Sequence, residues 1–467
     1  MKKHIFFILW MIGWTGVAVG QLAVPSIIGD HMVVKQKSDF RLWGWGNPNA
    51  GLTITNSWDG DTVRAWVNQV GDWEAVLKTP PSGGPYEIKI RSGWEELIIR
   101  DVLSGEVWLC SGQSNMEWNG MRGLKQIGEE LPHCDNDRIR FFYVDKRASA
   151  NPQDHLPGKW VVCDAASLKR FSAIGYFFGK TLQSEFHFPV GLINSNWGGT
   201  PIEIWMPEFL WQNARLDSLR LRKGSWVVRK SQAYNAMIYP LRKYNITGTI
   251  WYQGESNVSN AAGYSELFTA LIEGWRKAFR QEFPFYYVQL APYARCPVPW
   301  GTTLIREQQD KTLALSKTGM VVITDLVDDV NNIHPQLKKE VGQRLAMLAA
   351  TEIYGKAGNP YSPRYRGMTV KKNQVEVEFS GAVDPLVVEG QECVGFEIAG
   401  EDRKFYPAKA TVESGKVVLS AKEVKRPVAV RFGFHNAAIG NLFGDNGLPV
   451  APFRTDDWKL EAGGNER

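Results

Sequence analysis

The sequence predicts an α/β protein in which a mostly parallel sheet, covered by helices on both faces, is flanked by β-sandwich regions. Residues 104–360 alternate short apolar runs with amphipathic helical patterns. Residues 21–103 instead contain short runs of alternating apolar and polar side chains, and this pattern returns over residues 361–467. Strand–helix alternation is typical of a parallel sheet between two helical layers, and short alternating runs are typical of a β-sandwich.

Residues 1–20 are predicted to be a secretory signal peptide. Lys2 and Lys3 precede an almost wholly apolar run, residues 5–19, which ends in the small residues Ala18-Val19-Gly20. This order predicts cleavage before Gln21. An uncleaved membrane anchor is the alternative, although the apolar run is short for a bilayer span. We therefore expect a secreted or periplasmic protein with no membrane span after signal cleavage.

The charge and the cysteine content argue against a nucleic-acid partner, a cysteine metal site and a dense disulfide framework. The formal net charge is only +5 over 467 residues and no basic run stands out, so we expect no nucleic-acid partner. The five cysteines are odd in number and widely spaced, which fits neither a metal-ligand spacing nor a dense disulfide framework. At most two disulfides can form, and the spacing does not say which.

Residues 21–103 are predicted to form an N-terminal β-sandwich domain. Apolar and polar residues alternate in segments 40–44 and 86–91, and turn sequences lie at residues 47–49 and 80–84. Alternation with a period of two buries one face of each strand, so two sheets are expected to pack face to face.

Residues 104–360 are predicted to form the parallel-sheet domain. The candidate strands are residues 106–110, 190–194, 247–252, 285–290 and 320–324. Two amphipathic helices carry the apolar faces Ile174, Phe177, Phe178 and Leu182, and Leu337, Val341, Leu345 and Leu348. Right-handed crossovers bring the carboxyl ends of parallel strands to one edge, where such sheets bind ligands.

Residues 361–467 are predicted to be a C-terminal β region. Candidate strands lie at 374–379, 394–398, 417–420 and 429–432. They form either a separate domain or strands that complete the N-terminal domain, and the pattern does not choose between these.

The first chemically suggestive motif follows the first strand of the parallel sheet. A strand runs into Gly112-Gln113-Ser114-Asn115, after which a helical pattern begins. A serine on a sharp strand-to-helix turn exposes its hydroxyl, and its backbone N–H points to where an oxyanion would form. A helix N-cap serine is the structural alternative. Ser114 is our candidate nucleophile.

Two more polar motifs follow later strands. Gly198 and Gly199 come after the second strand and would let backbone amides approach a ligand, although an ordinary glycine turn has the same sequence. The side chains that crowd the tip of the third strand are Gln253, Glu255, Ser256 and Asn257. Polar groups at such a place serve either loop hydrogen bonds or a site, and we favour a site.

The fourth motif supplies a candidate general base. His334 lies after the last predicted strand, beside the carboxylates of Asp325, Asp328 and Asp329. The other histidines outside the signal peptide fall in β regions, in a polar insertion or at a helix end: His31, His133, His155, His187 and His435. A base oriented by a third group needs the surroundings that His334 alone has.

Together the four motifs resemble the sialate O-acetylesterase family of the SGNH/GDSL hydrolases. The segments that carry the resemblance are Gly112-Gln-Ser-Asn-Met116, Asn194-Ser-Asn-Trp-Gly-Gly-Thr200, Trp251-Tyr-Gln-Gly-Glu-Ser-Asn257 and Ile333-His-Pro335. The resemblance implies an SGNH-type three-layer α/β/α domain with flanking β domains, no metal or other cofactor, and hydrolysis of an O-acetyl ester through an acetyl-enzyme. It implies Ser114 as the nucleophile and His334 as the base.

The same resemblance implies donors for the oxyanion. These are the backbone amides of Ser114 and of the Gly198-Gly199 turn, with one polar side chain of the third motif. Gln253 is our first choice for that side chain and Asn257 the second, with Glu255 in the same substrate-binding group.

One position departs from the family pattern. Most SGNH enzymes have an aspartate three residues before the histidine, and Asn331 stands there. Asparagine can orient an imidazole but cannot stabilise its cation as a charge. The site is therefore either a Ser–His dyad or a triad completed by Asp325, Asp328 or Asp329, among which we choose Asp328.

The expected substrate is an acetylated carbohydrate, in the first place an O-acetylated sialic acid. Sialic acid carries a carboxylate, so an arginine near the site would favour it, and Arg122 and Arg306 are candidates. Acetylated xylan or another plant polysaccharide is the alternative substrate. A non-catalytic sugar-binding protein is a further alternative, against which the intact Ser114 and His334 argue.

Overall fold

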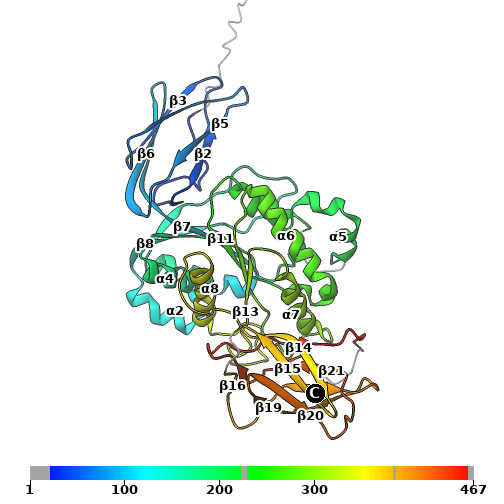
Figure 1. The fold of residues 1–467 in the computed structure, drawn as a ribbon. Helices are drawn as coiled ribbons and strands as arrows, with labels where there is room; N and C mark the ends of the chain where they lie inside the picture. Colours follow the sequence, from blue (N-terminus) through cyan, green and yellow to red (C-terminus); the bar gives the residue numbers. More distant parts are fainter. Residues whose placement is uncertain (1–20, 222–228, 382–384, 461–467) are drawn as a thin grey trace, which may run out of the picture.

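The computed structural model describes residues 21–221, 229–381 and 385–460. An N-terminal β region, a central α/β layer and a C-terminal β region follow one another along the molecule (Figure 1). The predicted signal peptide, residues 1–20, lies outside the described residues.

The N-terminal region contains two small sheets. Its strands are β1 (Val33–Lys35), β2 (Asp39–Trp45), β3 (Gly51–Asn56), β4 (Thr62–Trp66), β5 (Asp72–Lys78) and β6 (Gly83–Ser92). β2 pairs with β5, while β3 lies between β4 and β6. Along β5 the side chains of Trp73, Ala75 and Leu77 are buried and those between them are exposed, because successive side chains of a strand point to opposite faces.

One long strand joins this region to the central layer. β7 (Glu95–Gly112) has 18 residues; its first part pairs with β6 and its last part lies in the middle of the central sheet. Gly105 marks the passage between the two parts, because a Cβ there would lie 2.0 Å from the carbonyl oxygen of Pro189. The continuous strand therefore joins the central sheet directly to the N-terminal strands.

The central sheet has the order β13-β12-β11-β7-β10-β8-β9. Its other strands are β8 (Asn136–Tyr143), β9 (Trp160–Cys163), β10 (Val190–Asn196), β11 (Gly248–Tyr252), β12 (Phe285–Val288) and β13 (Thr318–Val321). All neighbours in this path are parallel except β8 and β9. Gly112 at the end of β7 is in register with Asn196 of β10 and Tyr252 of β11. The first three predicted motifs therefore leave the sheet side by side.

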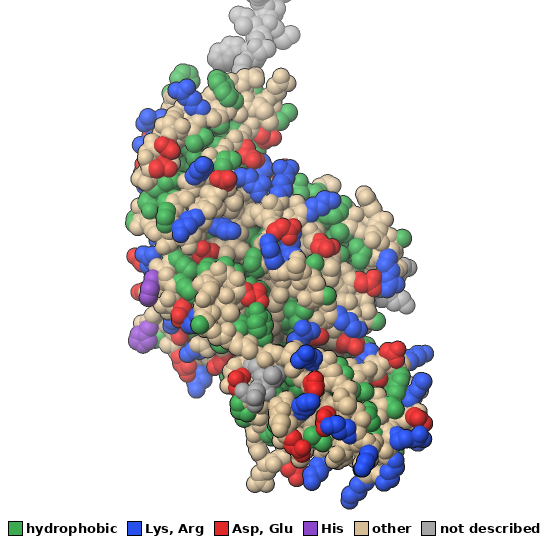
Figure 2. Space-filling model, in the orientation of Figure 1, with side chains coloured by type: hydrophobic (Ala, Val, Ile, Leu, Met, Phe, Trp, Pro, Cys, Tyr) green, Lys and Arg blue, Asp and Glu red, His purple; other side chains and the backbone are tan. Residues whose placement is uncertain are grey.

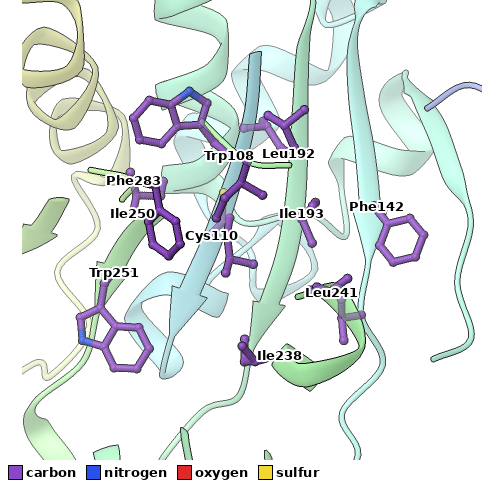
Figure 3. Close-up of a cluster of buried hydrophobic side chains, with 14 of the residues drawn as sticks. Trp108, Cys110, Phe142, Leu192, Ile193, Ile238, Leu241, Ile250, Trp251 and Phe283 are labelled. Atoms are coloured by element: carbon purple, nitrogen blue, oxygen red, sulfur yellow. The ribbon is translucent and has the colours of Figure 1, made fainter. Parts of the chain in front are cut away.

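Helices cover both faces of this sheet, as predicted. α4 (Ala173–Phe186) and α8 (Lys338–Glu352) pack together on one face, and α6 (Tyr264–Phe279) and α7 (Gly301–Thr312) cover the other (Figure 1). Trp108 of β7 and Trp251 of the neighbouring β11 both belong to the buried cluster drawn in Figure 3, and they contact helices of the two opposite layers. Trp108 meets Phe178 of α4 at 4.7 Å between ring centroids, and Trp251 meets Trp275 of α6 at 5.8 Å. The three-layer α/β/α prediction is confirmed.

Shorter helices and turns connect these elements. The α-helical ones are α1 (Ser114–Glu117), α2 (Lys125–Glu130), α3 (Ala165–Leu168) and α5 (Ala214–Leu219). The 3₁₀ segments are Gly120–Arg122, Leu131–His133, Ile202–Trp205, Glu208–Gln212, Tyr239–Leu241 and Glu255–Gly263, and Tyr234–Ile238 is a π-helical turn.

The C-terminal strands pair with one another and not with the N-terminal strands. One sheet contains β14 (Arg364–Lys371), β15 (Gln374–Ser380), β20 (Lys416–Ser420) and β19 (Lys409–Glu413). A second contains β18 (Phe405–Pro407), β17 (Phe396–Ala399), β21 (Ala429–Phe432) and β23 (Phe453–Arg454), and β16 (Val387–Val388) pairs with β22 (Leu442–Phe443). Val377, Ile398 and Leu419 belong to a separate buried cluster between these strands. On the face drawn in Figure 2, basic side chains of this region are mixed with acidic ones.

Two further features bear on the sequence predictions. All five cysteines are free thiols in the described part of the chain. Within those same residues, none of the helices is both long and apolar enough to cross a bilayer.

Candidate active site

Ser114 stands on a tight turn at the carboxyl end of β7. Gly112 has a φ of +131°, and a Cβ there would lie 2.2 Å from the carbonyl oxygen of Tyr252, so only glycine fits. The N–H of Gln113 donates to the same carbonyl at 2.9 Å. α1 begins at Ser114, where a helix leaves backbone N–H groups without intrahelical partners. The turn therefore presents both the hydroxyl and the N–H of Ser114 at the sheet edge.

His334 meets Ser114 across 220 positions of sequence. Its Nε2 lies 2.9 Å from the Oγ of Ser114. The loop that carries His334, between β13 and α8, is held by two local hydrogen bonds: the His334 N–H donates to Asn332 Oδ1 at 3.0 Å, and Gln336 Nε2 donates to the His334 carbonyl at 2.7 Å. The structure thus brings together the two residues that the sequence singled out as nucleophile and base.

An aromatic ring holds the imidazole on its face. Trp118 stacks on His334 with ring centroids 4.1 Å apart and planes 24° apart. The guanidinium of Arg122 lies 4.9 Å from the Trp118 ring centroid. Trp118 ends the same motif as Ser114, so one short segment supplies both the serine and the surface that orients its partner.

The surroundings favour the neutral form of His334. Burial, together with the cations Lys338 and Arg122, lowers the pKa of His334 to about 4, although Glu117 acts in the opposite direction. A neutral imidazole can accept a proton from a serine hydroxyl, whereas an imidazolium cannot. His334 is therefore neutral at pH 7, in the form that a general base requires.

None of the carboxylates that the structure describes orients this histidine. Among the described residues, no Asp or Glu oxygen lies within 4.0 Å of a His334 ring nitrogen. Asp325 binds both guanidinium nitrogens of Arg344, at 2.7 and 2.5 Å. Asp329 accepts from Asn331, and Asp328 accepts from the Gln336 N–H at 3.2 Å. In this structure the Asp328 carboxylate serves the loop backbone, and its role as third member of a triad stays a prediction.

The Gly198-Gly199 turn lies directly beside Ser114. A Cβ on Gly198 would come within 3.3 Å of the Ser114 Cβ. The Gly198 N–H is already engaged, since it donates to Glu117 Oε2 at 2.6 Å. Gly199 has a φ of +75°, which turns the chain at this point. Of the two predicted amides, that of Gly198 is committed to Glu117.

The side chains of Gln253 and Asn257 are part of a buried polar network. Gln253 Nε2 donates to the Thr200 carbonyl at 3.1 Å and to Asn257 Oδ1 at 2.7 Å, and Tyr264 donates to Gln253 Oε1 at 2.7 Å. Asn257 Nδ2 in turn donates to Glu203 Oε2 at 2.9 Å. Both amide hydrogens of Gln253 are thus used in holding loops together. The role of Gln253 as oxyanion donor, with Asn257 as substitute, stays a prediction.

Three groups that the sequence analysis did not select lie behind the Ser–His pair. Asn115 follows the serine, its Nδ2 donating to Glu255 Oε1 at 2.5 Å and to the Ile333 carbonyl at 3.0 Å. The Nζ of Lys338 donates to Asn115 Oδ1 at 2.5 Å. Glu117 binds Lys146 at 2.6 Å besides Gly198. In the sequence, the only sign that these three residues belong to the site is their position close to the serine and histidine motifs.

The two arginines considered for a substrate carboxylate differ in access. Arg306 is fully buried, and its guanidinium donates to the carbonyl of His435. The Arg122 side chain is 49% exposed and lies 3.5 Å from Glu117 Oε1. Only Arg122 is therefore accessible to a ligand at the Ser114 site.

A small cavity of about 40 Å³ adjoins the site. Its lining includes Glu255, Leu290, Pro292 and Ile333, the residue before the histidine. The described residues contain no group of three or more His, Cys, Asp or Glu side chains arranged to hold a metal ion.

The chain is similar to known carbohydrate esterases. The family described as "Carbohydrate esterase, sialic acid-specific acetylesterase" matches residues 104–351. The sialate O-acetylesterase of Homo sapiens is 31% identical over 386 residues, covering 74% of this chain and 73% of that protein; the Rattus norvegicus enzyme is 30% identical over 396 residues, covering 71% and 73%. The crystal structure of a carbohydrate acetylesterase from Xanthomonas citri superposes with a TM-score of 0.86 at 34% identity, covering 94% of this chain and all of the other. The family match contains Ser114 and His334.

Proposed function

Because the chain belongs to the sialic acid-specific acetylesterase family of carbohydrate esterases, and is therefore a carboxylic ester hydrolase, we propose that it is a secreted serine esterase that removes O-acetyl groups from sugars. Ser114 is its nucleophile and His334 its general base. The observation that carries this proposal is the 2.9 Å contact between Ser114 Oγ and His334 Nε2, at the sheet edge where parallel α/β sheets bind ligands.

The proposed reaction has two halves. Ser114 Oγ attacks the ester carbonyl carbon while its proton passes to Nε2 of His334. The bond between the acetyl carbon and the sugar oxygen then breaks, and the proton on His334 goes to that oxygen. Water attacks the resulting acetyl-enzyme, again losing a proton to His334, and acetate leaves as Ser114 regains its proton.

The negative charge on the tetrahedral intermediate requires donors aimed at it. The N–H of Ser114 is at the free end of α1, and Gly199 lies in the turn beside it. We assign the oxyanion to these two amides. The Gly198 amide instead fixes the turn through Glu117.

The proposed substrate is an O-acetylated sialic acid. Arg122 supports this choice, since it is exposed beside Trp118 and His334 and a guanidinium binds a carboxylate strongly. A xylan acetyl ester carries no carboxylate and would gain nothing from Arg122. Residues 1–20 support secretion through their charged start, apolar run and small-residue exit.

Acetate release from a panel of acetylated sialic acids, xylans and pectins tests the proposal. The Ser114→Ala variant is the control for chemistry at this site. Release of acetate from sialic acids by the wild type, but not by Ser114→Ala, supports the proposal. A preference for xylan would mean that the substrate is a plant polysaccharide. If the wild type releases acetate from no ester, including aryl acetates, the protein is a non-catalytic sugar-binding protein. Amino-terminal sequencing of the exported protein, expected to begin at Gln21, tests secretion.

A further inference from the structure

A buried chain of three polar side chains runs behind Ser114 and His334. Lys338 donates through Nζ to Asn115 Oδ1, and Asn115 donates through Nδ2 to Glu255 Oε1, both at 2.5 Å. The three residues come from the start of α8, from α1 and from the segment after β11. These hydrogen bonds therefore connect α1, which begins at the nucleophile, with α8, which follows the base, and with the segment after β11.

Asn115 also reaches the loop of the base. Its Nδ2 donates to the carbonyl of Ile333 at 3.0 Å, and Ile333 precedes His334, while Asn115 follows Ser114. One amide group thus fixes the backbone next to both members of the pair. This matters because no carboxylate within the described residues reaches the imidazole.

Lys338 is an unusual residue for such a place. Its side chain is 1% exposed, and lysine is rarely buried unless it is paired. Its pKa is lowered to about 7, because the effect of burial outweighs the raising effect of the nearby carboxylates of Glu255 and Asp328. Its Nζ also lies 5.5 Å from the centroid of the Tyr252 ring. Below neutral pH the site therefore contains a buried ammonium.

This ammonium acts on His334. The charged groups that face the imidazole are Lys338 from α8, Arg122 from the 3₁₀ segment after α1, and Glu117 from α1. A nearby cation disfavours the imidazolium, and a buried cation does so with less screening than an exposed one. Lys338 is the larger of the two cationic influences, ahead of Arg122.

We propose that Lys338, Asn115 and Glu255 are positioning residues that take the place of the absent orienting aspartate. Their hydrogen bonds hold the Ser114 turn against the His334 loop, and the Lys338 ammonium keeps His334 in its neutral, proton-accepting form. This inference rests on the proposed function, in which His334 is the general base.

The electrostatic part of the proposal is tested by the acid limb of the pH profile of kcat/KM, which is the pH range where activity falls as His334 becomes protonated. In Lys338→Met the limb moves to higher pH by about one unit, because the repelling cation is gone. Lys338→Arg retains the charge and leaves the limb near that of the wild type. Lys339→Met is the matched control, since it makes the same change on the next, less buried residue. The substrate is an aryl acetate, and active sites are counted by titration with a serine-directed fluorophosphonate.

The positioning part is tested through Asn115. Asn115→Ala lowers kcat per titrated site by roughly 10²-fold with KM nearly unchanged, because a small displacement of Ser114 from His334 is costly. An acid limb unmoved in Lys338→Met, or a wild-type kcat in Asn115→Ala, overturns the proposal.

Folding and the underlying mechanism are separated by two further variants. If Lys338→Met does not fold because Glu255 loses its nearby buried cation, the double variant Lys338→Met with Glu255→Gln removes both charges, and its limb is expected at the same raised pH. A wild-type limb in a folded double variant also overturns the proposal. Wild-type activity in Ser114→Ala would instead refute the proposed function itself.

Discussion

The indole of Trp118 lies flat against the imidazole of His334, with ring centroids 4.1 Å apart. Aromatic stacking of this kind fixes the plane of a ring without adding charge. Since no carboxylate in the described part of the chain contacts the histidine, the stack is a second means of orienting it, besides the hydrogen bonds of its loop.

Replacing Trp118 therefore tests how the base is held. Trp118→Ala is expected to lower kcat by about 10 to 10²-fold, because the imidazole gains rotational freedom, and Trp118→Phe should retain most of the activity. Steady-state kinetics at pH 7 measure the effect. Trp94→Ala is the control, since that ring is 97% exposed. Equal kcat values for Trp118→Ala and the wild type would show that the stack does not orient His334.

The pH dependence follows from the surroundings of His334. Burial, Lys338 and Arg122 lower its pKa to about 4, and the neutral imidazole is the active base. A lowered pKa extends the active form toward acid, so kcat/KM should hold its plateau to about pH 5 and fall below that. A profile of kcat/KM against pH shows this directly. A midpoint at the ordinary histidine value, about 6.5, would contradict it.

Arg122 discriminates between the two substrate classes. Arg122→Gln is expected to raise KM for O-acetylated sialic acids by roughly tenfold, the value of one charge-assisted hydrogen bond. Acetylated xylose, which has no carboxylate, should show no change at pH 7. Arg64→Gln, an exposed arginine on β4, is the control. A similar increase in KM for both sugars would mean that Arg122 does not bind the carboxylate of sialic acid.

Gln253 is expected to act through stability. Gln253→Ala removes three buried hydrogen bonds, those of its side chain with the Thr200 carbonyl, Asn257 Oδ1 and the Tyr264 hydroxyl, which should cost about 2 kcal/mol or more in the free energy of unfolding. Urea unfolding measures this, with the exposed Gln69→Ala as control. An unchanged free energy together with a 10²- to 10³-fold loss of kcat would instead make Gln253 an oxyanion donor.

Much of the fold and the core of the site could be predicted from residue order. Polar residues after apolar strands gather at one edge of a parallel sheet, so Ser114, Gly198 and Gln253 were expected near one another. The in-register ends of β7, β10 and β11 explain why this reasoning succeeded. His334 was identified by elimination among the histidines, and its contact with Ser114 agrees with that choice.

The individual roles within the site depended on geometry that sequence does not contain. Asp328 and Gln253 had suitable chemistry, but nearer partners in the folded chain use their hydrogen-bonding groups. Lys338 begins an amphipathic helix, where lysine normally faces water, and its burial depends on Asn115 and Glu255 from distant segments. β8 was also missing from the predicted strands, because its polar first residues resemble the insertion before it.

Identification of the acetyl-enzyme tests the central claim most directly. The enzyme is mixed with an aryl acetate, quenched in acid during turnover, digested and analysed by mass spectrometry. One acetyl group should appear on the peptide that contains Ser114, and fragmentation should place it on that serine. The label should be absent in Ser114→Ala, which should also release no acetate. An acetyl group on another residue, or wild-type acetate release by Ser114→Ala, would contradict the account.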